Sequence, residues 1–426
     1  MNMSNSSLKH VRFTCALIIV FCMVLVCLSG CSSEKPAEAA DNNAPDLVKI
    51  ADNLYETTYT TDFDWGDTTT PDMSGFSCSA VQNGQYRGRN YDWTYADTDL
   101  CVVHTTVTEN RPHASVGVAD MSFLLNDDGS LNYPKLPFVT VDGINDAGVC
   151  IQVNVMPYGE NGEISHTEAI DDDLAGARVV RYVLDYADSV ENALAFLKDK
   201  DIHSEMGTAE ELHWMISGPA SKADSTIKTV VVEVFPDGLH ITEKFVDDKP
   251  IMTNLNVSNF DGTPDTVGIG LGYERWQILD ENYNQANSVM GTFDLMEKVY
   301  FSKMYDLYGD RFWYSEYNGV DLTKYYDVET LKSMLGEDTY NYYMDNYGGV
   351  YYTSALWDGE KTINGDISKT GILAPSVEKV AELYNAQNKE NGSLWITIHT
   401  SVYDLENLTL DIQVRESQDH LHFTID

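Results

Sequence analysis

Residues 75–93 read Gly-Phe-Ser-Cys-Ser-Ala-Val-Gln-Asn-Gly-Gln-Tyr-Arg-Gly-Arg-Asn-Tyr-Asp-Trp. Residue character alternates on both sides of Gln82-Asn83-Gly84-Gln85, a pattern that is typical of paired β-strands. The Asn-Gly pair suits the left-handed backbone positions of a tight turn. We therefore predict a β-hairpin, whose second strand brings Arg89 and Asp92 back toward Cys78.

Such a hairpin has a consequence for the chemistry of Cys78. A thiol beside a fixed guanidinium group is reactive, because the positive charge favours the thiolate. Taken alone, however, Cys78 is more typical of a small buried hydrophobic residue. The prediction of reactivity therefore depends on the residues that surround it.

Further motifs follow the hairpin in a fixed order along the chain. In that order they are Gly88 to Asp92, Asp142 to Val149 running into Asn154 and Pro157, Arg181 to Asp185, Leu212 to Ser217, Met252 to Asn254, Gly270 to Trp276, and Leu394 to Leu405. As an ordered set over about residues 76–415, they resemble the choloylglycine hydrolase family, the linear-amide hydrolases within the N-terminal nucleophile group. The resemblance implies an α+β fold of the αββα four-layer sandwich type.

The same resemblance implies how the thiol is activated. Cys78 would be the nucleophile, and its own α-amine would be the general base, since a free amine has a pKa of roughly 7.7 to 8. Arg89 would steady the thiolate, and Asp92 would orient the amine. Each of these two residues also has a simpler interpretation, Arg89 as a structural ion-pair residue and Asp92 as a turn residue.

Two asparagines and a second arginine complete the implied site. Asn254 and Asn154 would donate hydrogen bonds to the oxyanion, and Arg275 would complete the charged network. Loss of one oxyanion donor typically costs on the order of 3 kcal/mol in the activation barrier. Asparagines near strand ends also make local turns without any catalytic part, and Arg275 could pair with acidic residues on the surface.

The position of Cys78 in the chain sets a requirement for activation. Since 77 residues precede it, it becomes an N-terminus only if the bond between Ser77 and Cys78 is cut. The simplest route is attack of the Cys78 thiol on the preceding carbonyl. Two other departures from the family pattern are a short interval between Cys78 and Arg89, and no acidic residue at Gly218-Pro219.

Regular structure along the rest of the chain also predicts an α+β domain. Strand-like runs are Cys101 to Val107, Ala114 to Leu125, Gly148 to Val155, Thr226 to Phe235, Leu394 to Leu405 and Leu408 to Val414. Helix-like segments are Leu174 to Ala187, a helix capped by Ser189 and ending at Lys198, Phe293 to Met304, Val328 to Leu335, and Val377 to Gln387. Strands and helices do not alternate as they would in a parallel βαβ repeat, so a layered α+β arrangement is favoured.

The N-terminus is typical of an exported protein. Lys9 and Arg12 precede an apolar run, Phe13 to Leu28, that ends at Leu28-Ser29-Gly30-Cys31. This ending resembles a bacterial lipobox, in which Cys31 is acylated and becomes the first mature residue; the alternative is an ordinary signal peptide. Either cut removes two basic and no acidic residues, leaving a net charge of −42. Lipid on Cys31 would then hold the chain outside the cytoplasm at a bacterial membrane.

These observations predict four parts of the chain. They are a signal peptide (1–30), a polar tether (31–48), a propeptide-like segment (49–77) that packs on the main domain without a core of its own, and a hydrolase domain (78–426). The last contains a Tyr-rich insertion at about 301–370, and 12 of the 26 tyrosines lie within 301–360. This insertion is either an aromatic wall or lid for an apolar ligand, or a surface element packed through amphipathic tyrosines.

Composition limits the partners and cofactors. With 27 basic against 67 acidic residues and a net charge of −40, the chain lacks the basic surface that binds nucleic acid. No cofactor is predicted, and His420 and His422 are interpreted as exposed strand residues rather than metal ligands, because no further ligand stands at the right spacing. A homo-oligomer is left open.

Four cysteines remain after the apolar run: Cys31, Cys78, Cys101 and Cys150. Outside the cytoplasm Cys101 and Cys150 could form a disulfide, and two buried free thiols are the equal alternative.

The sequence thus predicts a small-molecule hydrolase of linear amides, without cofactor. Bile-acid conjugates, penicillin V, N-acyl amino acids and N-acyl lactones all present the same amide. An acidic surface slows the approach of anionic bile salts, which favours N-acyl compounds in general. The alternatives are an acyltransferase with the same site and an inactive, lipid-tethered binding module.

Overall fold

The computed structural model describes residues 45–65, 77–93, 99–126, 130–157, 173–203, 210–235, 238–263, 272–308, 320–321, 327–337, 340–341, 344, 351–352, 396–417 and 419–425. The chain divides after Ala44, and all described residues belong to the unit Pro45–Asp426. The predicted signal peptide, the lipidation residue Cys31, most of the Tyr-rich segment and the predicted helix Val377 to Gln387 lie outside the described residues.

A nine-stranded sheet forms one half of this unit. Its strands, in spatial order, are β1 (Val48–Ala51), β2 (Leu54–Tyr59), β5 (Leu100–Thr105), β6 (Ser115–Asp120), β7 (Thr140–Asn145), β8 (Cys150–Pro157), β11 (Glu210–Ser221), β12 (Asp224–Phe235) and β13 (Gly238–Thr242). β2 and β5 are parallel, and the other neighbours in this sheet are antiparallel.

A six-stranded antiparallel sheet faces it. Its strands are β14 (Ile251–Met252), β3 (Ser77–Asn83), β4 (Tyr86–Trp93), β17 (Ile396–Asp404), β18 (Thr409–Val414) and β19 (Leu421–Thr424). Two small pairs, β9 (Asp173–Ala175) with β10 (Asp201–His203) and β15 (Val320–Asp321) with β16 (Tyr351–Tyr352), stand apart from both sheets.

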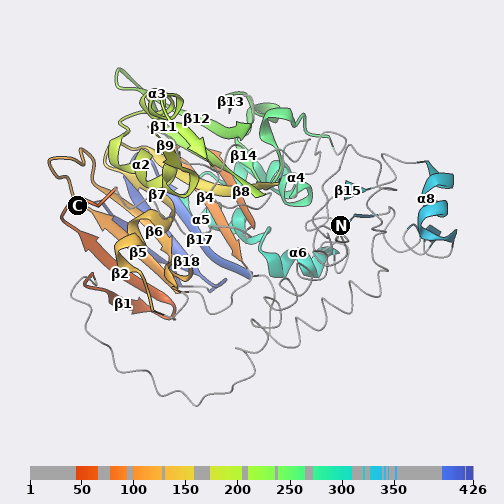
Figure 1. Ribbon diagram of the computed structural model, residues 1–426, viewed down its shortest axis with the longest axis horizontal. Helices are drawn as coiled ribbons and strands as arrows, with labels where there is room; N and C mark the ends of the chain where they lie inside the picture. The colour runs from red at the N-terminus through yellow and green to blue at the C-terminus, as the bar shows by residue number, and fades with distance from the viewer. Residues whose placement is uncertain are drawn as a thin grey trace, which may run out of the picture. The chain divides into compact units, whose positions relative to one another are not determined.

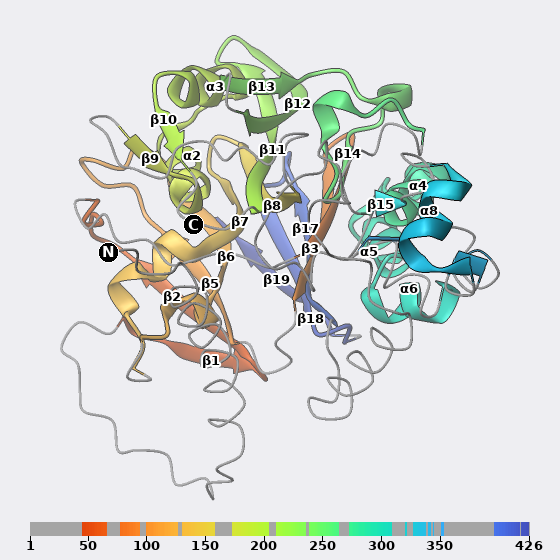
Figure 2. The same cartoon turned by 45° about the vertical axis from the view of Figure 1, so that its right-hand side comes forward.

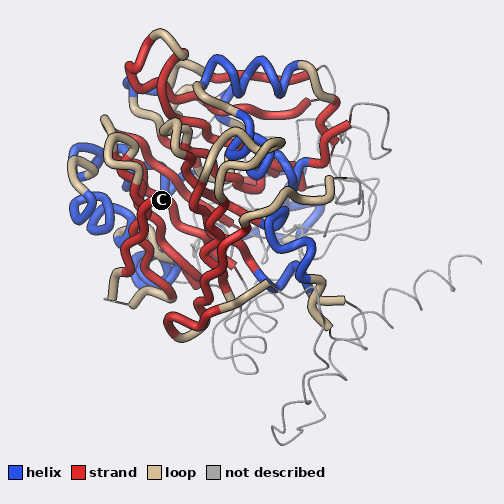
Figure 3. The backbone as a smooth tube through the Cα atoms, turned by 90° about the vertical axis from the view of Figure 1, so that its left-hand side faces the viewer, coloured by secondary structure: helices blue, strands red, loops and turns tan. Residues whose placement is uncertain are grey.

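Helices cover the outer face of each sheet. The described helices are α2 (Val179–Tyr186), α3 (Val190–Lys198), α4 (Tyr273–Asn282), α5 (Val289–Glu297), α6 (Phe301–Tyr308) and α8 (Val328–Leu335), with short 3-10 turns at Met121–Leu124, Tyr133–Val139, Gly176–Arg178, Val246–Asp248, Val257–Asn259 and Tyr283–Gln285. The first two pack on β7, β8, β11 and β12, whereas α4, α5 and α6 pack on β3, β4, β14 and β17 (Figures 1 and 2). Because β3 contacts β8 and β18 contacts β7 between the sheets, the layers are helix, sheet, sheet, helix, with the strands inside (Figure 3). The predicted α+β, αββα class is confirmed.

The helices begin where their sequences provide caps and apolar faces. Ser189 accepts a hydrogen bond from the backbone N–H of Asn192, which confirms the predicted N-cap of α3. Val190, Ala193 and Leu197 then fall on one buried side of that helix.

Three predicted boundaries are wrong. The helix predicted from Leu174 begins at Val179, because residues 173–175 pair with β10 instead. The helix predicted over Phe293 to Met304 is two helices, α5 and α6, separated at residues 298–300. The strand predicted to reach Leu125 ends at Asp120, whose side chain caps the following 3-10 turn.

The segment preceding Cys78 contributes to the nine-stranded sheet. β2 pairs with β5 over six positions, from Leu54 opposite Leu100 to Tyr59 opposite Thr105. Leu54 is fully buried in the main hydrophobic core. The prediction that this segment packs on the domain holds, but it packs as part of the sheet and shares its core.

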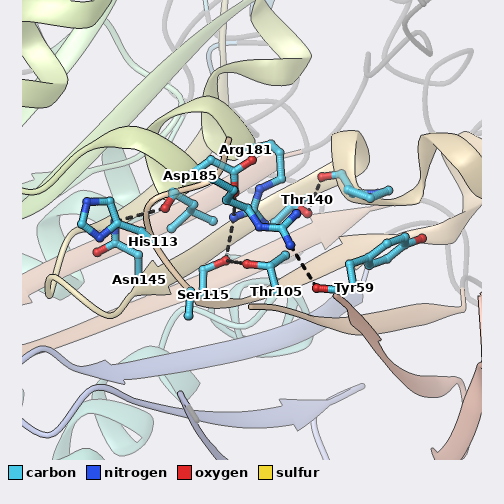
Figure 4. A network of polar contacts seen from close by, with 12 residues as sticks. Tyr59, Thr105, His113, Ser115, Thr140, Asn145, Arg181 and Asp185 are labelled. Atoms are coloured by element: carbon cyan, nitrogen blue, oxygen red, sulfur yellow. Dashed lines mark hydrogen bonds and ion pairs between the residues drawn. The ribbon is translucent and has the colours of Figure 1, made fainter. Parts of the chain in front are cut away.

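Polar and aromatic contacts extend this attachment to residue 65. Arg111 donates to the carbonyls of Tyr59 (3.0 Å) and Thr61 (3.1 Å), and the ring of Trp65 lies 5.0 Å from that of Phe138. Beneath them, Arg181 of α2 bonds Asp185 and Ser115, so the segment rests on a buried charged network (Figure 4).

Polar residues occupy the space between the two sheets. Arg87, Arg89 and Asp142 are all fully buried there, although each carries a charge in its ordinary state. Buried charges are stable only when paired or well hydrogen-bonded. The candidate site is built around these pairings. No described helix is long and apolar enough to span a membrane.

Candidate active site

Cys78 is the second residue of β3 and is fully buried. The predicted hairpin is present: β3 and β4 pair through a two-residue loop, with Cys78 opposite Tyr91 and Ala80 opposite Arg89. Only Gly84 of the turn has a left-handed backbone (φ +55°), as in hairpins with glycine at the first loop position, so Asn83 does not take the left-handed position that was expected. Residues directly opposite each other share a face, which places Arg89 beside Cys78.

Arg89 holds the thiol of Cys78. Its Nη2 lies 3.2 Å from Cys78 Sγ and donates to the carbonyl oxygen of Val153 at 2.9 Å. Its Nη1 donates to Asp142, and both partners of this ion pair are fully buried. The guanidinium is therefore fixed in place next to the sulfur.

Asp142 is the anion that balances Arg89. It also bonds His399 Nε2 (3.0 Å), Ser401 Oγ (3.2 Å) and the hydroxyl of Tyr403. Burial alone raises the pKa of Asp142, but Arg89 and His399 lower it more, so its pKa lies below the usual range. Asp142 stays charged at neutral pH.

A second set of contacts holds the backbone of Cys78. Its N–H donates to Asn254 Oδ1 at 2.9 Å, and its carbonyl accepts from Arg275 Nη1 at 2.7 Å. Arg275 Nη2 also donates to Asn254 Oδ1 at 2.8 Å. Asn254 follows β14, which pairs with β3, and Arg275 is the third residue of α4, so three elements converge on the peptide groups on either side of the Cys78 Cα.

Asp92 belongs to this set through Arg275. It lies on the opposite face of β4 from Arg89, and its Oδ1 accepts from Thr397 Oγ1 at 2.6 Å. Its Oδ2 lies 3.5 Å from Arg275 Nη1. Burial raises the pKa of Asp92 to about 7, although Arg275 and Thr397 act in the other direction. In the uncleaved chain the Cys78 N–H is bonded to Asn254, and Asp92 reaches Cys78 through Arg275.

Asn154 lies on β8, between the two residues whose carbonyls anchor the site. Arg89 donates to the carbonyl of Val153, and Asn254 Nδ2 donates to that of Val155 at 2.5 Å. The side chain of Asn154 bonds Gln152. The structure thus groups Cys78, Arg89, Asp92, Asn254 and Arg275 by direct bonds, and it places Asn154 beside them without a bond to Cys78.

The thiol of Cys78 is not activated in the uncleaved chain. Burial raises the pKa of Cys78 to about 12, and Arg89, the next largest influence, lowers it only in part. The expectation that Arg89 alone makes a thiolate is therefore wrong for this state, because the loss of water around the sulfur outweighs one neighbouring charge.

The other two cysteines in the described part of the chain are free. Cys101 and Cys150 are buried thiols, so the alternative of a disulfide between them is wrong. Cys101 lies on β5 and Cys150 on β8, with β6 and β7 between them. Three strand spacings of about 4.8 Å put them roughly 14 Å apart, beyond the reach of a disulfide.

Sequence reasoning assigned no role to several residues that hold the site. Asp142 was part of a quoted motif, and a charged residue within an apolar strand was the available signal. Thr397, His399 and Tyr403 lie within the quoted motif Leu394 to Leu405, but the groups they bond lie more than 250 residues away in the chain, so the sequence did not reveal these partners. Among the described residues no group of three metal-ligating side chains lies close enough to bind a metal ion. A described cavity of about 230 Å³ lies between residues 62–65 and α2, away from Cys78.

Comparison with known proteins gives structural similarities only. No protein-family model matches the chain, and no curated protein matches it. Two variants of the conjugated bile acid hydrolase from Clostridium perfringens are similar in structure, with 15% and 17% identity and TM-scores of 0.36 and 0.37, covering 82% of this chain and 92% of the hydrolase. Penicillin V acylase from Agrobacterium tumefaciens is similar at 15% identity and a TM-score of 0.35, covering 82% of this chain and 86% of the acylase.

Proposed function

We propose that this chain is a hydrolase of linear amide bonds whose nucleophile is the thiol of Cys78, exposed as an N-terminal residue by cleavage after Ser77. One observation carries the proposal. A single cysteine has its sulfur held by Arg89, its N–H by Asn254 and its carbonyl by Arg275, all in a buried site. Three separate bonds to one residue fix both its thiol and its future amine.

The first step of the proposal is self-cleavage. Cys78 Sγ attacks the carbonyl carbon of Ser77, the carbon–nitrogen bond breaks, and the thiol proton passes to the departing nitrogen. Water then hydrolyses the thioester, which frees the Ser77 carboxylate and restores the thiol. A pKa near 12 makes the attacking thiolate scarce in the uncleaved chain, so we expect this step to be slow relative to turnover.

Turnover uses the new amine as base. An α-amine with a pKa of roughly 7.7 to 8 accepts the thiol proton near neutral pH. The thiolate, steadied by Arg89, attacks the amide carbonyl, and the leaving amine takes the proton back. Water hydrolyses the resulting thioester and releases the acid. Asn254 Oδ1, which accepts from the Cys78 N–H, would then orient the amine.

Charge in the site favours this assignment. Asp142 neutralises Arg89, and Asp92 lies beside Arg275 and compensates its charge when ionised. The guanidinium at Cys78 Sγ can therefore stabilise a thiolate when the sulfur loses its proton. Asp92 acts as a support for Arg275 in this scheme, and Asn154 and Asn254 are the candidate donors to the oxyanion.

The proposed substrates are N-acyl compounds. The candidates are bile-acid conjugates, penicillin V, N-acyl amino acids and N-acyl lactones, and the acidic chain favours those with little negative charge. A panel of acylated taurine, glycine and other amino acids, scored by the amine released, would separate these classes.

The first prediction tests the nucleophile. Mass spectrometry of the purified protein should show a new N-terminus at Cys78, and Cys78→Ala should leave the chain uncut and without amidase activity. Cys101→Ala, a change to another buried thiol on β5, is the matched control and should keep both. An intact single chain with full activity would refute the mechanism.

The same purified protein distinguishes the hydrolase from the two alternatives, an acyltransferase and an inactive binding module. If an added amine captures the acyl group in preference to water, the protein is an acyltransferase. If Cys78 resists iodoacetamide and the chain stays whole, it is a binding module that keeps the fold without the reaction.

We also propose that the chain is exported and anchored outside the cytoplasm by lipid on Cys31. The support is the order of basic residues, apolar run and small residues before Cys31 in the sequence. The anchor would then belong to the fragment that self-cleavage separates from Cys78.

A further inference from the structure

Asn154 has an unusual amide group for a buried residue. The side chain is fully buried, and its Oδ1 accepts a hydrogen bond from Gln152 Nε2 at 3.1 Å. Its Nδ2, in contrast, has no hydrogen-bond partner among the described residues. A buried donor left unpaired costs roughly 1 to 3 kcal/mol, so its orientation needs a cause.

The orientation of the Asn154 amide is set by Gln152, and the orientation of Gln152 is set in turn by Arg87. Arg87 Nε donates to Gln152 Oε1 at 3.2 Å. An arginine can only donate, so the Gln152 oxygen must face Arg87 and its amino group must face Asn154. The oxygen of Asn154 then faces Gln152, and its Nδ2 is turned away from Gln152. Arg87, Gln152 and Asn154 thus form a row of hydrogen bonds, and the direction of each bond in this row is set by the arginine.

Arg87 itself has no freedom to reorient. It is fully buried, and it donates to the carbonyls of Cys150 (3.1 Å) and Met215 (2.6 Å) and to Ser217 Oγ (3.1 Å). These partners lie on β8 and β11, so the guanidinium links the two sheets at a fixed position.

The row ends beside the reactive cysteine. The carbonyls on either side of Asn154 accept from Arg89 and Asn254, the residues that bond the thiol and the N–H of Cys78. Asn254 Nδ2 already donates to Val155, whereas Asn154 Nδ2 donates to none of the residues that the structure describes. This difference makes Asn154 the better placed of the two to give a hydrogen bond to a developing oxyanion.

We propose that Arg87 and Gln152 are positioning residues, which hold Asn154 so that its amide nitrogen is the donor to the oxyanion. This inference rests on the proposed amidase function. It assigns roles to two residues that neither contact the substrate nor belong to the predicted site.

The test reverses the direction of the hydrogen bond between residue 152 and Asn154. Gln152→Glu keeps the shape and the bond to Arg87, but a carboxylate only accepts, so Asn154 must turn its nitrogen toward it. We expect kcat to fall about 100-fold with KM unchanged within about twofold, the size of loss found when an oxyanion donor is removed. Gln152→Met, which adds no charge, should give a smaller loss because Asn154 can then adopt either orientation.

Two further variants separate positioning from general damage. Gln152→Glu combined with Asn154→Ala should be no slower than Asn154→Ala alone, because both changes remove the same donor. Gln413→Glu, another buried glutamine whose oxygen accepts from the hydroxyl of Tyr300 (2.6 Å), is the matched control and should keep kcat. Rates are expressed per chain with a free Cys78 N-terminus, counted by mass spectrometry.

The outcomes are distinct. A wild-type protein that cleaves no acylated substrate overturns the proposed function and the positioning role with it. If the wild type is active and both Gln152→Glu and Gln152→Met keep its kcat, the positioning role alone is overturned. It is also overturned if the fold-losses in kcat of Gln152→Glu and Asn154→Ala multiply in the double variant.

Discussion

Burial raises the pKa of two carboxylates beside the site, but their other contacts leave the two pKa values shifted in opposite directions. Asp142 accepts from Arg89, His399, Ser401 and Tyr403, and these partners bring its pKa below the usual range despite burial. Asp92 has fewer partners, and burial raises its pKa to about 7. The number and charge of the bonded groups therefore decide which carboxylate titrates near neutrality.

Asp92 should make stability fall as pH rises. Its folded pKa of about 7 exceeds the roughly 3.9 of an unfolded aspartate, so the folded state binds more protons between these values. That contribution is complete below about pH 4 and is lost as pH rises through 7. We expect the melting temperature of the uncleaved Cys78→Ala protein to fall, relative to that of its Asp92→Asn derivative, as the pH rises from 4 to 7.5. Thermal unfolding across that range measures it, and a difference that is constant with pH would contradict the assignment.

The sequence predicts contacts within one hairpin better than contacts between distant segments. The proximity of Arg89 to Cys78 follows from strand pairing across a short turn. The bonds of Asp142 to His399 and Tyr403 join residues 257 and 261 positions apart, and they exist only because β7 and β17 lie in facing sheets. The pKa of Cys78 escaped prediction for the same reason, since burial is a property of the folded layers.

At the scale of elements, the hairpin is fixed from outside by α5. Gly88 of β4 faces that helix, and a Cβ built on it would lie 2.6 Å from Thr292 Cγ2 and 2.8 Å from Met296 Cγ. Such distances leave no room for a methyl group. The helix thus approaches the strand that carries Arg89 and Asp92 as closely as a glycine allows.

Gly88→Ala should therefore separate α5 from the hairpin. We expect a loss of about 1 to 3 kcal/mol in the free energy of unfolding, typical of overpacking, measured by denaturant titration. Adding Thr292→Ser removes the nearest methyl group but keeps the hydroxyl that bonds the Ser288 carbonyl. The double variant should recover part of the loss, and equal or greater destabilisation in the double variant would show that the close contact is not the cause.

Elements with clear periodicity were predicted well, and irregular ones were not. The cap at Ser189 and the predicted end at Lys198 gave α3 correctly, and β8, β12, β17 and β18 lie within or close to their predicted runs. β1 and β2 were missed because both are short and largely half-exposed or exposed, and neither has a clear apolar alternation. A long-range parallel pairing such as β2 with β5 leaves no local trace in the sequence.

At the scale of the whole chain, the segment that precedes Cys78 is a structural part of the domain. β2 lies between β1 and β5 in the nine-stranded sheet, so its removal would expose the edge of β5. Leu54 would leave the core, and Arg111 would lose the carbonyls of Tyr59 and Thr61. The free energy of these contacts does not depend on a covalent link between residues 65 and 77.

Cutting the chain between these residues should consequently leave two fragments that stay together. A site for a sequence-specific protease, inserted within 66–76 of the Cys78→Ala protein, makes the cut independent of self-cleavage. We expect the N-terminal fragment to co-elute with the remainder in gel filtration and to separate only in denaturant. Leu54→Asp, which places a charge at a fully buried position of β2, should release the fragment, because an unpaired buried charge is strongly unfavourable. If the wild-type fragment leaves a folded remainder, β2 is dispensable; if it stays, a lipid on Cys31 would still hold the cleaved enzyme at the membrane.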